Sequence, residues 1–211
     1  MESPSLNTAD ETFRTLTVYL TAQLKPDAET RPMVAPVEAV WGDLKAAADN
    51  HEAQVDAMVA ALALRDRVDV QVDDFVRAQF RTAQGVYGAT SKKLGELYPG
   101  GLTPLIKGTV SEQPSGMRVL ATRLEADGSE AVAAGAAPIR EKAATLKEVV
   151  DMFAASVEQV ATAWSRVLKA RAEWIRMYEK TFGELVALVG KKKANTYFKK
   201  TTKQKKKKPT V

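Results

Sequence analysis

Residues 34–64 read VAPVEAVWGDLKAAADNHEAQVDAMVAALAL, and this stretch decides the fold. Side chains that are apolar, apart from one histidine, recur in it at alternating intervals of three and four positions. This spacing places them along one edge of an α-helix, which we call the seam. The first seam consists of Val34, Val37, Trp41, Leu44, Ala48, His51, Val55, Met58 and Leu62. The pattern predicts a long helix that packs against another helix in the manner of a coiled coil.

The seam continues beyond a charged interruption at Arg65-Asp66-Arg67. It resumes about one position out of phase, with Val68, Val72, Phe75, Gln79, Ala83 and Val86. Between Pro36 and Gly85 the only glycine or proline is Gly42. We therefore expect one continuous helix with a phase shift, which Tyr98-Pro99-Gly100-Gly101 stops. A hairpin at residue 65 is the alternative.

A second seam of the same kind begins near Ala137-Pro138 and extends to about residue 190. It consists of Ile139, Ala143, Leu146, Val150, Phe153, Val157, Val160, Trp164, Val167, Arg171, Trp174, Tyr178 and Leu185. With an offset of 102 residues, Ala35-Pro36 matches Ala137-Pro138 and Gly88 matches Gly190. Either residues 33–98 and 135–190 are an internal duplication joined by a 99–134 connector, or two alanine-rich helices resemble each other by chance.

Charge interrupts both seams at equivalent positions, Asp69 and Arg171. A charged group on an apolar seam is tolerated when it is paired, and such a pair can fix the register of two helices. If the two long helices pack antiparallel, we expect Asp69 and Arg171 to form a polar pair near mid-length.

The rest of the chain predicts shorter elements. Residues 9–24 carry Phe13, Leu16, Leu20 and Leu24 at helical spacing and predict a short amphipathic helix after a disordered start over residues 1–8. Short helices are expected at 103–107 and 114–126. The predicted fold is all-α, with two long antiparallel coiled-coil-like helices, either continuous or bent or split into a four-helix arrangement, short connector helices and a disordered basic tail. The corresponding divisions are an N-terminal segment over 1–32, a helical body over 33–190 and a lysine-rich tail over 191–211.

Residues with catalytic or metal-binding chemistry are scarce. The chain has no cysteine and a single histidine, His51, which lies on the seam. A di-iron helix bundle needs glutamate three residues before its histidine, and that position is Ala48. The segment Gly85–Lys93 fails the spacing of a phosphate-binding loop. We therefore expect a protein that is not an enzyme and that takes no cofactor, metal or small-molecule ligand.

The charge of the chain is concentrated at its end. Residues 191–211 hold ten lysines and no acidic residue, whereas the other 190 residues hold 21 basic and 26 acidic side chains. The lysines are Lys191, Lys192, Lys193, Lys199, Lys200, Lys203, Lys205, Lys206, Lys207 and Lys208. They predict contact with a polyanion, with Tyr197 and Phe198 available to stack on bases or enter a lipid interface. A solubilising tail without a specific partner is the alternative.

These features predict a non-catalytic helical scaffold or protein-interaction protein. It would self-associate or bind a protein partner through its helical faces and contact polyanions through its tail. The alternatives are a non-specific nucleic-acid-associated protein and a peripheral protein of anionic membranes. No apolar run is long enough to span a membrane, and the first residues lack the features of a secretory signal, so we expect a cytoplasmic location.

Overall fold

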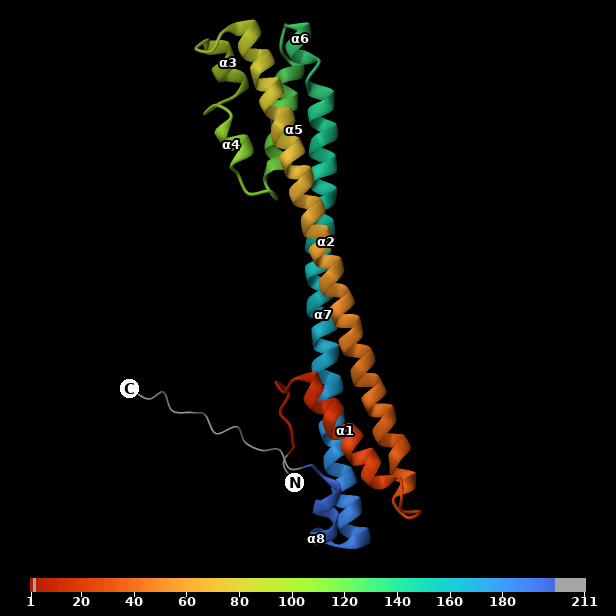
Figure 1. Cartoon of the computed structure of the whole chain (residues 1–211). Helices are drawn as coiled ribbons and strands as arrows, with labels where there is room; N and C mark the ends of the chain where they lie inside the picture. Colours follow the sequence, from red (N-terminus) through yellow and green to blue (C-terminus); the bar gives the residue numbers. More distant parts are fainter. Residues whose placement is uncertain (2, 200–211) are drawn as a thin grey trace, which may run out of the picture. The chain divides into compact units, whose positions relative to one another are not determined.

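The computed structural model describes residue 1 and residues 3–199, and over these ranges it contains helices and turns but no β-strand (Figure 1). This confirms the all-α prediction. The elements in chain order are α1 (Asp10–Leu24), η1 (Arg31–Met33), α2 (Val34–Tyr87), α3 (Lys92–Leu97), α4 (Thr103–Ile106), α5 (Gln113–Glu125), α6 (Glu130–Ala133), α7 (Ala136–Val189), α8 (Lys191–Ala194) and η2 (Asn195–Tyr197).

Helix α2 is continuous through the charged interruption, so the hairpin alternative at residue 65 is wrong. Arg65 is accommodated there in two ways. Its guanidinium lies 4.6 Å from the ring centroid of Phe153 on α7, and it binds the Asp66 carboxylate at 2.6 Å. A cation over an aromatic face keeps a favourable environment without leaving the helix–helix contact.

The end of α2 differs from the prediction. The helix stops at Tyr87, shortly after Gly85, rather than at Tyr98. Gly88 follows with φ +87°, a backbone conformation that costs glycine little and ends a helix readily. A separate helix, α3, then starts at Lys92, where the Ser91 hydroxyl accepts a hydrogen bond from the Leu94 amide at 3.1 Å.

The two long helices have the same length, 54 residues each, and both of their ends are related by the offset of 102. Each is followed by a glycine with positive φ, Gly88 at +87° and Gly190 at +78°. The offset found in the sequence thus extends to the helix boundaries. An internal duplication stays a prediction.

The chain forms two compact units, which we describe separately. Unit 1 comprises residues 1–53 and the chain from residue 161 onward, and unit 2 comprises residues 54–160. Each unit contains a part of α2 and a part of α7. In unit 2 these parts run antiparallel, because Arg65 lies over Phe153 whereas Gln79 packs against Gly135, just before α7 begins.

The core of unit 1 forms around α1. Phe13, Leu16, Leu20 and Leu24, the residues predicted to face the core, are all at most 2% exposed. They pack with the start of α2 and the end of α7, where Trp174 is completely buried. The Trp174 indole donates a hydrogen bond to the Thr17 hydroxyl at 2.9 Å, so burial leaves its one polar group satisfied.

The core of unit 2 forms around α5, which lies within one residue of its predicted position. Its buried face includes Met117, Leu120, Ala121 and Leu124. These side chains pack with Val72, Val76 and Ala83 of α2 and with Ile139, Ala143, Leu146 and Val149 of α7. The helix predicted at 103–107 is also present, as α4.

A buried carboxylate joins the end of α2 to the turn after α5. The side chain of Asp127 is completely inaccessible to solvent and accepts hydrogen bonds from the Tyr87 hydroxyl and, at 2.9 Å, from the Ser129 amide. The Lys93 ammonium lies 3.3 Å from the same carboxylate. The hydrogen bond from Tyr87 lowers the pKa of Asp127 below its ordinary value; burial opposes this effect, and the contacts with Ser129 and Lys93 add to it.

This environment predicts acid sensitivity of unit 2. Because the folded state lowers the pKa of Asp127, the carboxylate stabilises unit 2 above its unfolded pKa of about 3.9, and this stabilisation is lost as the pH falls through the lower, folded value. Asp127→Asn should therefore weaken unit 2 at pH 7, and the difference from the parent chain should shrink as the pH falls below about 4. Urea unfolding followed by circular dichroism at both pH values measures this.

Glu125→Gln provides the control. Glu125 binds a basic residue, Arg140, just as Asp127 lies beside Lys93, but the Glu125 side chain is 59% exposed. Its removal should change stability little at either pH, since exposed ion pairs contribute little. A loss of stability for Asp127→Asn that stays constant down to about pH 2 would contradict the role assigned to its charge.

Candidate functional site

The chain turns sharply where α7 ends, and this turn positions the first predicted lysines. Gly190 adopts φ 78° and ψ 154°, a conformation that only glycine tolerates well. Helix α8 and the 3₁₀ turn η2 follow directly, and Ala194, Tyr197 and Phe198 are buried in unit 1. Residues 191–198 are therefore folded, and the prediction of a disordered tail that starts at residue 191 is wrong.

Aromatic and polar contacts hold this segment in place. The Phe198 ring packs edge-on against Tyr178 and Phe182, with centroids 4.8 and 5.3 Å apart. The Tyr197 hydroxyl donates a hydrogen bond to the Asp27 carboxylate at 2.8 Å, and this bond raises the pKa of Tyr197. Both aromatic residues are thus committed to unit 1, and the prediction that they stack on bases or enter lipid is wrong.

The lysines of this segment remain accessible. Lys191, Lys192 and Lys193 occupy the exposed positions of α8, and Lys199 is exposed directly after Phe198. The other predicted polyanion-binding lysines, Lys200, Lys203, Lys205, Lys206, Lys207 and Lys208, lie outside the described residues. We call Lys191–Lys193 together with Lys199 the lysine cluster.

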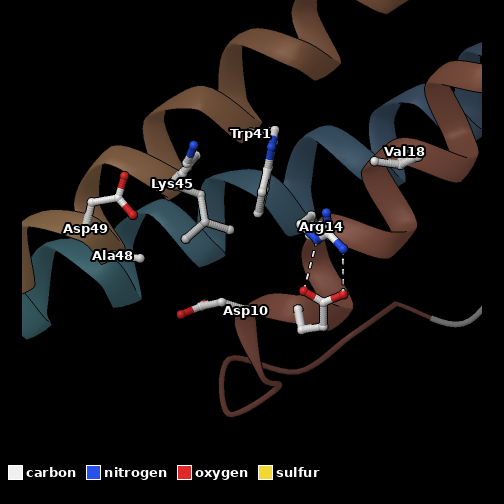
Figure 2. A pocket seen from close by; sticks show the side chains of 9 residues that line it. Asp10, Arg14, Val18, Trp41, Lys45, Ala48 and Asp49 are labelled. Atoms are coloured by element: carbon white, nitrogen blue, oxygen red, sulfur yellow. Dashed lines mark hydrogen bonds and ion pairs between the residues drawn. The ribbon is translucent and has the colours of Figure 1, made fainter. Parts of the chain in front are cut away.

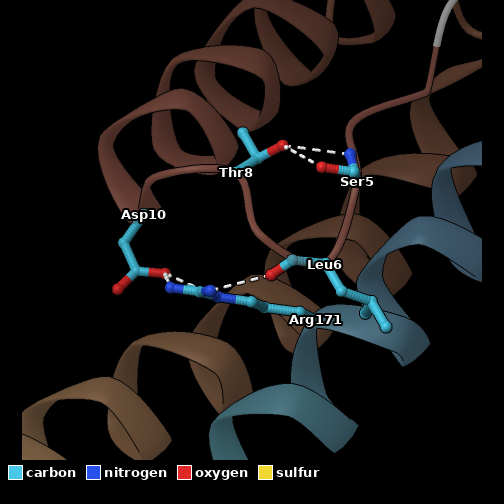
Figure 3. Close-up of polar contacts among 5 residues, drawn as sticks. All are labelled: Ser5, Leu6, Thr8, Asp10 and Arg171. Atoms are coloured by element: carbon cyan, nitrogen blue, oxygen red, sulfur yellow. Dashed lines mark hydrogen bonds and ion pairs between the residues drawn. The ribbon is translucent and has the colours of Figure 1, made fainter.

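Arg171 is bound by a residue that belongs to neither seam. Its guanidinium donates hydrogen bonds to the Asp10 carboxylate at 2.8 and 3.1 Å and to the Leu6 carbonyl at 2.8 Å (Figure 3). It also lies 5.1 Å from the ring centroid of Trp164. Arg171 therefore attaches the segment before α1 to α7. This attachment contradicts the prediction of a disordered start over residues 1–8.

The carboxylate that binds Arg171 belongs to Asp10, whereas the prediction named Asp69. Asp69 lies in unit 2, where one of its carboxylate oxygens is buried without a hydrogen-bond partner among the described residues. Burial, with a further contribution from the charge of Asp69, raises the pKa of the neighbouring Asp73. Arg77 offsets part of this effect by binding Asp73 at 3.1 Å.

Unit 1 also contains an open groove of about 410 Å³ between α1 and α2 (Figure 2). Trp41 lines it together with Lys45 and Asp49, which lie one helical turn apart on α2. On the α1 side, Arg14 is bound by both carboxylate oxygens of Glu11 at 2.9 and 3.0 Å. The groove mixes both signs of charge, and we assign it no ligand.

The seam pattern does not reveal this groove. It predicts Trp41 to be a core residue, whereas the structure leaves Trp41 half-buried. The exposure of Trp41 depends on where α1 packs on α2, and the seam pattern of α2 carries no information on that packing.

The single histidine, His51, packs against a tryptophan. His51 is half-buried, with its ring centroid 5.2 Å from that of Trp164. Within the described part of the chain, no group of three or more potential ligands is arranged to hold a metal ion. Within the same part, none of the helices combines the length and apolar character that crossing a membrane requires.

Comparison of the chain with models of protein families, with curated proteins and with solved structures gave no match. Function is therefore inferred from the residues and their geometry.

Proposed function

We propose that this protein is a non-catalytic helical scaffold that contacts polyanions through the lysine cluster and the lysines that follow it. One observation carries the proposal. Three consecutive exposed lysines are fixed on α8 by the burial of Ala194, Tyr197 and Phe198 on the same short segment. Lysines held at one site lose less conformational entropy on binding than lysines on a free chain.

The environment of the lysines favours the phosphate backbone of double-stranded nucleic acid over the alternatives. A protein that enters lipid usually presents an aromatic side chain next to its basic residues, and one that binds single strands presents an aromatic platform. Tyr197 and Phe198 are at most 5% exposed and cannot serve in either way in this fold. Lysine contacts with phosphates need no aromatic group and carry no sequence preference.

The test compares two variants with equal net charge. The triple variant Lys191→Gln, Lys192→Gln and Lys193→Gln removes the cluster on α8. The control Lys92→Gln, Lys107→Gln and Lys169→Gln removes three exposed lysines elsewhere. Binding to a duplex of arbitrary sequence is measured by fluorescence anisotropy over a range of salt concentrations.

We expect the cluster variant to bind more weakly and with a shallower salt dependence. The slope of log K against log salt should fall by about 0.9 for each phosphate that a lysine no longer neutralises, and so by about 2.7 for three lysines. The control should retain the slope of the parent chain. Equal weakening in the two variants would show that only net charge matters and would contradict a defined site.

A truncation completes the test. A chain that ends at Lys199 keeps the buried residues of the segment and lacks the lysines beyond it. It should bind more weakly than the full chain and still more tightly than the same truncation carrying the triple α8 substitution. Removal of residues 191–211 is unsuitable, because it would also remove Ala194, Tyr197 and Phe198 from the core. Vesicles of anionic lipid serve as a second probe, and tighter binding to them than to duplex would contradict the preference stated above.

A further inference from the structure

Unit 2 carries an apolar groove between residues 57–64 of α2 and residues 152–159 of α7. The groove has a volume of about 450 Å³, and every side chain that lines it is uncharged. The lining includes Ala57, Ala60 and Leu64 of α2 and Met152 and Ala155 of α7. Leu64 and Met152 are 40% and 47% exposed.

The groove is separate from the seam between the two helices. The groove lining follows the helical spacing i, i+3, i+4, i+7 on both helices. On α2 the lining residues are Ala57, Ala60, Ala61 and Leu64, and on α7 they are Met152, Ala155, Ser156 and Gln159. The seam residues of the same stretch, Met58 and Leu62, lie on another side of α2. A helix with two such faces is expected to have two neighbours.

The core of unit 2 ends before it reaches the groove. The core built around α5 includes α2 from Val68 onward and α7 up to Val150. The groove lies beyond those limits. Only residues of α2 and α7 line it, so no other described element of unit 2 covers it.

Charges beside the groove indicate what covers it. Asp56 lies about one turn before Ala60 on the same row of α2, and Arg67 lies about two turns after it. Both side chains are exposed, and neither forms an ion pair with another described residue of its own chain. Asp56 and Arg67 carry opposite charges. Counted along the helix, both lie equally far from the midpoint between Ala61 and Leu62.

This charge pattern is self-complementary under a two-fold rotation. When two copies of α2 meet antiparallel around that point, Asp56 of one copy faces Arg67 of the other, and the symmetry repeats the pair. The small side chains between them allow the helix axes to approach closely. We propose that residues 57–64 and 152–159 form the interface of a homodimer, in which the two copies build a four-helix arrangement around a two-fold axis. This inference does not depend on polyanion binding.

Charge reversal tests the proposal on the full chain. Sedimentation equilibrium at about 0.15 M salt should give twice the chain mass of 22.9 kDa for the parent protein. Arg67→Glu replaces two attractions by two repulsions and should raise the dissociation constant about tenfold or more. Asp56→Arg should do the same. Arg81→Glu, an exposed reversal on the same helix, is the control and should leave the dimer intact.

The decisive measurement combines the two single variants. Mixed in equal amounts, the Asp56→Arg chain and the Arg67→Glu chain should form a heterodimer, because each charge then meets its opposite. The double variant Asp56→Arg with Arg67→Glu should also recover the homodimer. Misfolding of a single variant cannot produce either rescue. A monomer at all concentrations of the parent chain overturns the proposal, and so does a dimer that both reversals leave unchanged.

Discussion

Trp174→Ala is expected to lower the free energy of unfolding of unit 1 by about 3–5 kcal/mol, the usual cost of removing a large aromatic side chain from a closed core. Trp174 is 0% exposed. Its ring stacks on Tyr178 with centroids 4.7 Å apart and meets the edge of Phe13 at 5.0 Å. The substitution also leaves the Thr17 hydroxyl without the indole donor. Urea denaturation followed by far-ultraviolet circular dichroism measures the decrease.

Trp164→Ala is the matched control. Trp164 lies on the same helix ten residues earlier and is 40% exposed. Its removal deletes the packing against Arg171 and His51 but opens no closed cavity. We expect a decrease of about 1 kcal/mol or less. Equal decreases for the two tryptophans would contradict the assignment of the unit 1 core to Trp174.

Arg171→Met is expected to destabilise unit 1 by about 1.5–3 kcal/mol, the range for hydrogen bonds to a charged group, and to release the segment before α1. Methionine preserves the apolar stem and removes the guanidinium that binds Asp10 and the Leu6 carbonyl. The Asp10 side chain is 43% exposed and regains water, which limits the destabilisation. Hydrogen exchange of residues 5–9 should become faster than in the parent chain.

Arg14→Met is the comparison for Arg171. Arg14 also binds a carboxylate through two hydrogen bonds, but the pair with Glu11 is 60% and 69% exposed. Solvent screens such a pair, so we expect little measurable change in stability. If Arg171→Met left hydrogen exchange over residues 5–9 unchanged, the anchoring role of Arg171 would be wrong.

The periodic stretches of the sequence predicted the long helices well. A seam in which apolar residues return every three or four positions leaves the backbone few other ways to bury them, so the predicted start of α2 at Val34 is accurate. Helix ends are less predictable. The end at Tyr87 depends on Gly88 with positive φ, and the chain contains several glycines that do not end a helix, such as Gly42 within α2.

The partner of Arg171 is not predictable from the seams. The seam pattern compares α2 with α7 and contains no information on where the chain before α1 lies. Asp10 precedes the apolar row of α1 by three residues, and only the docking of that row on α7 brings its carboxylate to Arg171. A charged residue on an apolar seam indicates that a partner exists without indicating which residue it is.

The lysine cluster shows how composition conceals structure. Ten lysines dominate residues 191–211, and their charge predicts disorder from the first of them. A short opposing signal is nevertheless present, because Ala194, Tyr197 and Phe198 follow the spacing i, i+3, i+4 of a buried helical face. The apolar area on these three residues is sufficient to hold the segment when Tyr178 and Phe182 are available to receive it.

Unit 1 is built from two separated segments of the chain, whereas unit 2 is continuous in sequence. This difference determines the order in which a ribosome completes the two units. Unit 2 is one uninterrupted stretch, so all its residues have been synthesised once residue 160 is added. Helix α1 must wait for a partner that is synthesised much later, since Thr17 and Trp174 are 157 residues apart. On the nascent polypeptide the apolar row of α1 therefore has only the start of α2 to pack against until the last part of α7 emerges, and co-translational folding of unit 1 is expected to finish with α1.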